Sequence, residues 1–137
     1  ALIEEREEEP PKGHGELILV VDDEAGIREM TRNTLEANGY RAVTACDGAE
    51  AIALCVQHEK EIWAVITDMV MPLMDGPATI HALHMLNPEL PVIATSGFAG
   101  ASQMNSLHDA AVRAFLTKPY TGKKLLRALA SIAGTTR

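Results

Sequence analysis

The apolar residues of this chain gather in short runs, and three of these runs end in charge. The three are Leu17–Val21 followed by Asp22 and Asp23, Ala64–Thr67 followed by Asp68, and Ala114–Thr117 followed by Lys118. A short, mainly apolar run without polar alternation is typical of a strand covered on both faces, as in the middle of a parallel sheet. We therefore interpret each run as a buried strand with charged residues at its carboxyl end.

Helical patterns and turn signals separate these runs. The predicted strands are Leu17–Val21, Arg41–Ala45, Ala64–Thr67, Val92–Thr95 and Arg113–Thr117. The predicted helices cover residues 25–38, 49–58, a stretch after Gly76 that ends near Leu86, residues 102–109, and a last helix capped by Thr121 that runs to about Ile132. Strands that alternate with helices predict an α/β domain with a doubly wound, five-stranded parallel sheet, that is, a (βα)5 three-layer sandwich.

Length and composition agree with one globular domain. The chain has 137 residues, of which 47% are hydrophobic, which suffices for a single core. The formal net charge of −7 argues against direct binding of nucleic acid, which needs clustered basic residues. Cys46 and Cys55 show neither metal-ligand spacing nor a disulfide framework, and no stretch has the length of a membrane span or the form of a signal peptide. We therefore expect a cytoplasmic domain without membrane contact.

The amino-terminal residues differ from the rest in composition. Residues 1–15 hold five acidic and two basic residues, together with Pro10-Pro11, Gly13 and Gly15. Such a segment is typical of a solvated linker or tail. We therefore predict an acidic linker or tail over residues 1–15 and one folded domain over residues 16–134.

The predicted fold brings the charged residues together. In doubly wound sheets, ligands bind beyond the carboxyl ends of the strands, and that is where Asp22, Asp23, Asp68, Ser96 and Lys118 fall. Two unit charges about 4 Å apart repel by roughly 4 kcal/mol at an effective dielectric constant near 20. Three neighbouring carboxylates therefore need either protons or a cation. Ligands that offer only oxygen favour a hard ion, and Mg²⁺ suits a site that also accepts phosphate oxygens.

These residue types point to phosphoryl chemistry. A cation would keep Asp68 ionised, and Asp68 could then act as a nucleophile that forms an aspartyl phosphate. The Lys118 ammonium would pair with Asp68 or with its phosphate. The Ser96 hydroxyl could donate a hydrogen bond to a phosphate oxygen.

Four motifs resemble those of bacterial two-component receiver domains. They are Val20-Val21-Asp22-Asp23-Glu24, the stretch from Asp68 to Gly76, Ser96-Gly97 and Lys118-Pro119, and the likeness covers about residues 16–134. The resemblance implies a flavodoxin-like fold. It also implies that Asp68 accepts a phosphoryl group from a histidine of a partner kinase or histidine phosphotransfer domain.

The resemblance further implies roles for single residues. Asp23 and Asp68 would bind Mg²⁺ directly, the Val70 backbone carbonyl would be the third protein ligand, and Asp22 would act largely through water. No other cofactor is implied.

Ser96 would be the switch hydroxyl and Phe115 the switch aromatic, and Lys118-Pro119 would have a cis peptide bond. Phosphate on Asp68 would draw Ser96 toward it and admit the Phe115 ring inward, which changes a surface that binds other proteins.

The resemblance leaves the context of the domain open. Few residues follow the last predicted helix, so we expect no DNA-binding output domain there and favour the C-terminal receiver of a hybrid sensor histidine kinase, whose parent chain can be membrane-anchored. The alternative is a stand-alone response regulator. Either way the isolated domain is not an enzyme beyond its self-catalysed phosphotransfer and dephosphorylation. Because residues 102–109 are mostly small or polar, we expect a monomer or a weak dimer.

Three other function classes fit the same residues less well. A flavodoxin-type electron carrier needs a phosphate-binding loop after the first strand, where Asp22 and Asp23 would instead repel a flavin phosphate. A phosphohydrolase of the haloacid-dehalogenase type usually has a second Asp two residues after its nucleophile, and this chain has Val70 there. The third class is a phosphate-independent interaction module.

Simpler interpretations exist for several polar residues. Asp22 or Asp23 alone could be the N-cap of the first helix. We interpret Asp75-Gly76 as a cap and turn. His81 and His84 could share a helix face, but without a third ligand we expect no metal site there.

Overall fold

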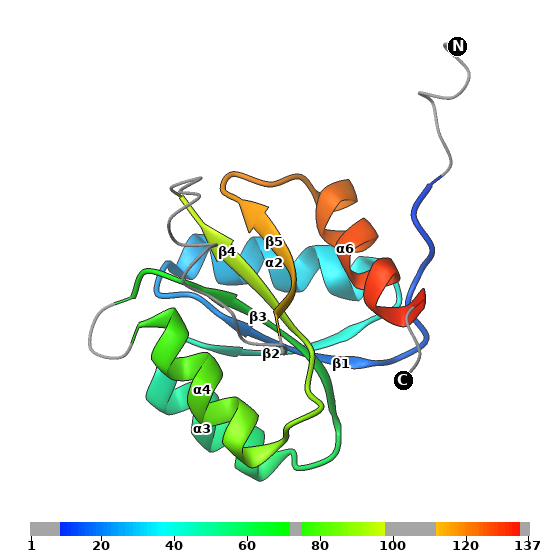
Figure 1. Ribbon diagram of the computed structural model, residues 1–137. Helices are drawn as coiled ribbons and strands as arrows, with labels where there is room; N and C mark the ends of the chain where they lie inside the picture. Colours follow the sequence, from blue (N-terminus) through cyan, green and yellow to red (C-terminus); the bar gives the residue numbers. More distant parts are fainter. Residues whose placement is uncertain (1–8, 72–74, 98–111, 135–137) are drawn as a thin grey trace.

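The computed structural model describes residues 9–71, 75–97 and 112–134 of the chain (Figure 1). The strands are β1 (Leu17–Val21), β2 (Arg41–Ala45), β3 (Ile62–Asp68), β4 (Val92–Ser96) and β5 (Val112–Thr117). The helices in these ranges are α2 (Ala25–Ala37), α3 (Gly48–Gln57), α4 (Gly76–Leu86) and α6 (Gly122–Gly134). The helix that we predicted over residues 102–109 lies outside the described residues.

The strands form one parallel sheet in the order β2-β1-β3-β4-β5. Helices α2 and α6 cover one face of the sheet, and α3 and α4 cover the other (Figure 1). This is the predicted doubly wound, flavodoxin-like three-layer architecture. No helix of the described segments is long and apolar enough to cross a membrane.

Strand β1 shows why a central strand has no polar positions. All five of its residues are buried, and alternate side chains enter two different cores. Leu17, Leu19 and Val21 pack in the core beneath α3 and α4, with Ala51, Cys55, Ile80 and Leu83. Ile18 and Val20 pack in the core beneath α2 and α6, with Leu35, Leu125, Leu129 and Ile132. Because both faces are covered, the period of two that marks a half-exposed strand is absent.

The helix starts follow the capping residues in the sequence. The Asp47 side chain accepts a hydrogen bond from the Glu50 backbone N–H (2.8 Å) at the start of α3. The Asp75 side chain accepts one from the Ala78 N–H (2.9 Å) at the start of α4, which confirms that Asp75 is a cap. Thr121 Oγ1 accepts one from the Lys124 N–H (3.1 Å) before α6, as predicted. Each cap satisfies a backbone donor that the helix leaves unpaired.

The described part of the predicted linker contacts the domain. Pro10 is buried, the Gly13 N–H donates to the Asn38 carbonyl (2.8 Å), and the Gly15 N–H donates to the Gly39 carbonyl (2.7 Å). Gly39 has φ +91°, and a Cβ there would collide with the Gly13 backbone. Residues 10–15 therefore lie against the turn between α2 and β2. The domain boundary at residue 16 stays a prediction.

Candidate functional site

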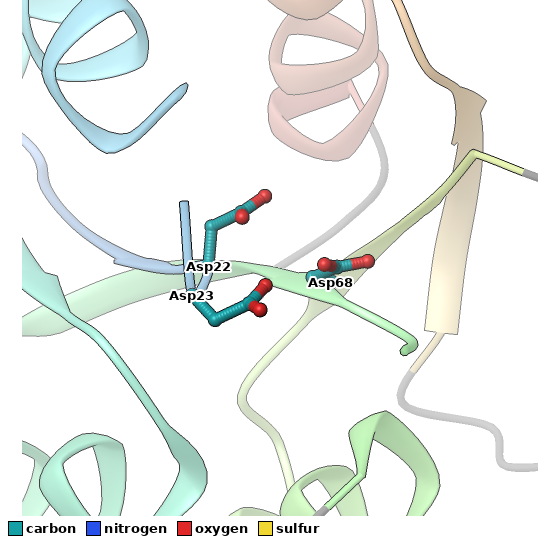
Figure 2. A group of neighbouring side chains, drawn as sticks. All are labelled: Asp22, Asp23 and Asp68. Carbon is teal, nitrogen blue, oxygen red and sulfur yellow. The ribbon is translucent and has the colours of Figure 1, made fainter. Parts of the chain in front are cut away.

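Sheet register brings two aspartates to one edge. Val21 of β1 pairs with Thr67 of β3, so Asp22, which follows β1, and Asp68, which ends β3, lie at the carboxyl ends of neighbouring strands. One carboxylate oxygen each of Asp22, Asp23 and Asp68 lies within 4.8 Å of the others (Figure 2). Asp22 and Asp68 are only 2% and 4% exposed, whereas Asp23 is open to solvent. The site therefore combines two buried carboxylates with an accessible one.

Lys118, which directly follows the edge strand β5, adds a positive charge to this group. Its backbone N–H donates to the Ser96 carbonyl (2.8 Å), which holds the carboxyl ends of β4 and β5 together. Its Nζ lies 2.7 Å from Asp22 Oδ2 and 3.1 Å from Asp68 Oδ2. A third carboxylate, that of Glu24, lies 3.6 Å from the same nitrogen. The ammonium thus sits between the two buried aspartates.

Burial controls the charges of this pair. Burial raises the pKa of Asp68, and the neighbouring Asp22 charge adds to it, while the hydrogen bonds from Lys118 and the Val70 N–H act in the opposite sense without cancelling the rise. Burial opposes the charge of Lys118, but its hydrogen bonds to Asp22 and Asp68 outweigh this and raise its pKa to about 12. Lys118 is therefore a cation at neutral pH, and this one cation faces three carboxyl groups.

The donor set fits a hard divalent cation. Asp22, Asp23 and Asp68 offer only carboxylate oxygens, and their mutual repulsion is relieved by positive charge. They are the one group of this kind among the described residues, so His81 and His84, on α4, belong to no such group. Oxygen ligands without sulfur or imidazole disfavour zinc and copper and suit magnesium, calcium or manganese.

Backbone contacts fix the orientation of the buried aspartates. Asp22 Oδ1 accepts a hydrogen bond from the Glu24 N–H (2.9 Å), and the Asp22 backbone carbonyl accepts one from the Arg28 guanidinium (2.7 Å). Asp68 Oδ1 accepts one from the Val70 N–H (3.3 Å). Neither Asp22 nor Asp23 is the N-cap of α2, because that position belongs to Glu24, which makes no side-chain cap bond.

The remaining predicted site residues lie on β4, on β5 and just after β3. Ser96 ends β4, is fully buried and pairs in register with Thr117. Phe115, on β5, is half-buried and packs against the core beneath α3 and α4. Val70 follows β3 and is 49% exposed. The Lys118-Pro119 peptide bond is cis.

Sequence reasoning missed three contributors. Glu24 approaches Lys118, Arg28 holds the Asp22 carbonyl, and Gly76 lies behind Asp68. A Cβ at Gly76 would stand 2.5 Å from Met69 Cα and 2.7 Å from the Asp68 carbonyl oxygen, so only glycine fits. The third consecutive acid in Asp22-Asp23-Glu24 was a usable signal for Glu24. The Arg28 contact spans helix and turn and has no local signature.

Comparison with known families agrees with this geometry. The family model for the response regulator receiver domain matches residues 18–130. The match spans most of the chain and includes the carboxyl ends of the strands that carry the site. The chain therefore belongs to the response regulator receiver domain family of two-component systems.

Curated relatives come from two kinds of protein. The chain is 33% identical over 108 residues to the sensor kinase CckA of Brucella abortus, a match that covers 79% of this chain and 11% of the kinase. It is 34% identical over 109 residues to the response regulator MprA of Mycobacterium sp. strain KMS, covering 80% of this chain and 46% of the regulator. The chain thus spans less than half the length of these relatives.

Solved structures share the fold along nine-tenths or more of their length. The receiver domain of the hybrid histidine kinase CckA is 30% identical with a TM-score of 0.72, covering 84% of this chain and 96% of that one. Chemotaxis protein CheY4 of Vibrio cholerae is 28% identical with a TM-score of 0.81, covering 86% and 98%. The CheX-CheY-BeF3-Mg complex of Borrelia burgdorferi matches at 25% identity and a TM-score of 0.81, covering 87% and 90%.

Proposed function

We propose that Asp68 accepts a phosphoryl group from a phosphohistidine of a partner histidine kinase or histidine phosphotransfer domain. The observation that carries this proposal is the grouping of a buried Asp68 with Asp22, Asp23 and the Lys118 ammonium at one sheet edge. Membership of the receiver family supports the same assignment.

The proposed reaction is an in-line transfer. A carboxylate oxygen of Asp68 forms a bond to phosphorus, the P–N bond to the donor imidazole breaks, and its electron pair stays on the imidazole nitrogen, which takes up a proton. Such a transfer depends on positioning and on stabilisation of negative charge. The Lys118 ammonium, 3.1 Å from Asp68 Oδ2, is suited to stabilise a phosphoryl oxygen at the same place. The Ser96 hydroxyl would donate a hydrogen bond to another.

We propose that the site holds Mg²⁺ through Asp23, Asp68 and the Val70 backbone carbonyl, with Asp22 acting through water. The oxygen-only donor set supports this assignment. When bound, the ion supplies positive charge that offsets the carboxylates and the incoming phosphoryl group. The similar CheX-CheY-BeF3-Mg complex contains magnesium and a fluoroberyllate, which supports the assignment of Mg²⁺ to this site.

The output would be a change in a protein-binding surface. Ser96 ends β4 and Phe115 is half-buried on the neighbouring strand β5. We propose that phosphorylation draws the Ser96 hydroxyl toward the acceptor and that the Phe115 ring moves inward, which shifts the population toward an active form.

Acetyl phosphate provides the direct test. Wild-type protein is treated with and without Mg²⁺ and weighed intact, beside Asp68→Ala and the control Asp47→Asn, which alters an exposed helix cap away from the site. We expect a single Mg²⁺-dependent phosphate adduct in wild type and control and none in Asp68→Ala. A folded wild-type protein without an adduct would instead support a phosphate-independent interaction module.

For the context of the domain, we propose the receiver of a hybrid histidine kinase that acts in the cytoplasm. Similarity to the sensor kinase CckA supports this, while similar identity to MprA supports the alternative of a shorter response regulator. Immunoblotting of native cells with an antibody against this domain separates the two. A band of kinase size is expected, and a band of domain size would favour a stand-alone regulator.

A further inference from the structure

A buried hydrogen bond joins two segments that each carry part of the site. The Tyr120 hydroxyl and Thr31 Oγ1 lie 3.0 Å apart, although the residues are 89 positions apart in the chain. Thr31 is 1% exposed and Tyr120 8%. The bond is therefore shielded from water, and a hydrogen bond in the protein interior is electrostatically stronger than one in water.

The two hydroxyls come from the segments that flank the charged residues. Thr31 lies on α2, which begins two residues after Asp23. Tyr120 lies two residues after Lys118, in the connection between β5 and α6. The bond thus ties the segment that follows the aspartates to the segment that follows the lysine.

The space around Gly122 shows that the same two segments lie close together. Gly122 begins α6, and a Cβ there would stand only 3.2 Å from Thr34 Cγ2 of α2. The connection from β5 to α6 therefore lies directly against α2. Asp22 and Lys118 lie just before these two segments, and their charged atoms are 2.7 Å apart.

We propose that Thr31 and Tyr120 are positioning residues, which set the distance between the Lys118 ammonium and the aspartates. This inference rests on the proposed function of the site. Neither hydroxyl touches the charged groups through a direct hydrogen bond, so both act through the segments that they join. Loss of the bond would let the β5–α6 connection shift and would weaken both metal binding and phosphoryl transfer.

Single and double variants of the pair can separate its effect on the geometry of the site from its effect on the stability of the fold. A single Tyr120→Phe or Thr31→Val variant leaves one buried hydroxyl without its partner, which destabilises the fold. Replacing both partners by apolar groups of similar shape is nearly neutral for stability. A merely structural pair would therefore recover fully in the double variant, whereas a positioning pair would not.

The experiment compares wild type, Tyr120→Phe, Thr31→Val, the double variant, and Thr31→Ser, which keeps the hydroxyl. Cys55→Ala is the control for general destabilisation, because Cys55 lies on α3, packs in the core between that helix and the sheet, and is not one of the proposed site residues. For each protein we measure the melting temperature, the Mg²⁺ dissociation constant by calorimetry, and the initial phosphorylation rate with acetyl phosphate.

We expect the double variant to melt near wild type but to lose roughly tenfold in both Mg²⁺ affinity and phosphorylation rate, as is common when a group that orients metal ligands is removed. Thr31→Ser should keep wild-type values, and Cys55→Ala should lower only the melting temperature. Either a wild-type Mg²⁺ affinity or a wild-type phosphorylation rate in the double variant would overturn the inference.

The two readouts separate failure of the inference from failure of the proposed function. If the wild type binds Mg²⁺ but takes no phosphate, the proposed function fails and the Mg²⁺ affinities alone decide the positioning role. If the wild type does neither, both are overturned.

Discussion

Two groups of ion pairs lie at opposite edges of the same sheet. At the carboxyl edge, Lys118 pairs with Asp22 and Asp68, and these side chains are 12%, 3% and 5% exposed. At the amino edge, Glu61 pairs with Arg41 (3.3 Å) and His58 (3.2 Å), and the side chains of Glu61 and Arg41 are half exposed. The distances are similar, so geometry alone does not distinguish the groups.

The pKa values of the acidic residues Glu61 and Asp68 shift in opposite directions in these two groups. Hydrogen bonds from His58 and then Arg41 lower the pKa of Glu61, and the slight burial of this exposed side chain does not offset them. Burial raises the pKa of Asp68 despite its bond to Lys118. The amino-edge pairs are ordinary surface pairs that contribute little to stability. Buried carboxyl groups around a buried ammonium are therefore what distinguishes the carboxyl edge, where we propose the functional site.

The largest difference should come from removing the cation of each group. Lys118→Met should lower the initial rate of phosphorylation by acetyl phosphate by about 10²-fold, because a preorganised positive charge stabilises the transferring group. Arg41→Met should leave the rate unchanged. Intact-mass time courses with Mg²⁺ measure both. A similar rate in the two variants would mean that the edges do not differ in function.

The amino edge should depend on backbone fit more than on charge. Gly39→Ala should lower the free energy of unfolding by about 1–3 kcal/mol, because the residue has positive φ and a Cβ would displace the Gly13 backbone. Gly26→Ala is the control, since it lies in helix α2 with open space around its Cβ position, and it should be neutral or stabilising. Urea unfolding measures both variants. An unchanged free energy of unfolding in Gly39→Ala would show that residues 10–15 do not pack firmly.

Divalent cations should stabilise only the carboxyl edge. At ten times its dissociation constant, Mg²⁺ should add about 1.4 kcal/mol to the free energy of unfolding of the wild type. Asp23→Asn removes the exposed carboxylate of the proposed metal site and should abolish most of the shift in melting temperature, whereas Glu61→Gln should keep it. An equal shift in all three proteins would indicate that the ion binds elsewhere.

The smallest effects should come from removing the charge of Asp68 or of Glu61. These effects are measured as melting temperatures at neutral pH without divalent cations. The folded state raises the pKa of Asp68, so its charge opposes folding, and Asp68→Asn should melt above wild type. The folded state lowers the pKa of Glu61, so its charge favours folding above its unfolded pKa, and this contribution is lost as pH falls through the folded pKa. Glu61→Gln should therefore melt slightly below wild type. Calorimetric scans in which both variants shifted the melting temperature in the same direction would contradict this contrast.

The sequence predicts most of the sheet because apolar runs bounded by charge have clear ends. The predicted bounds of β1 and β2 are those observed. β3 begins at Ile62, two residues earlier than predicted, because Ile62 pairs with Leu17 and is buried although Glu59, Lys60 and Glu61 precede it. Pairing with a neighbouring strand extended this element beyond its local pattern.

The charged residues of the site could be predicted because each directly follows a predicted strand. The rule that parallel strands end at one edge then brings Asp22, Asp68 and Lys118 together without knowledge of side-chain conformation. The contacts that orient them could not be predicted. The Thr31–Tyr120 bond and the Arg28 contact depend on how α2 packs. The hydrophobic period of a helix predicts which face is buried, but it does not predict the hydrogen-bond partner of a single residue.

The most direct test of the central claim is transfer from a P–N donor to Asp68. Phosphoramidate carries the same bond as phosphohistidine, and borohydride reduction of the product converts an aspartyl phosphate to homoserine, which peptide mass spectrometry locates. We expect Mg²⁺-dependent conversion at position 68 and at no other aspartate, and none in Lys118→Met on the time scale of the wild-type reaction. Conversion at Asp22 or Asp23, or a phosphate that remains on a histidine, would contradict the account.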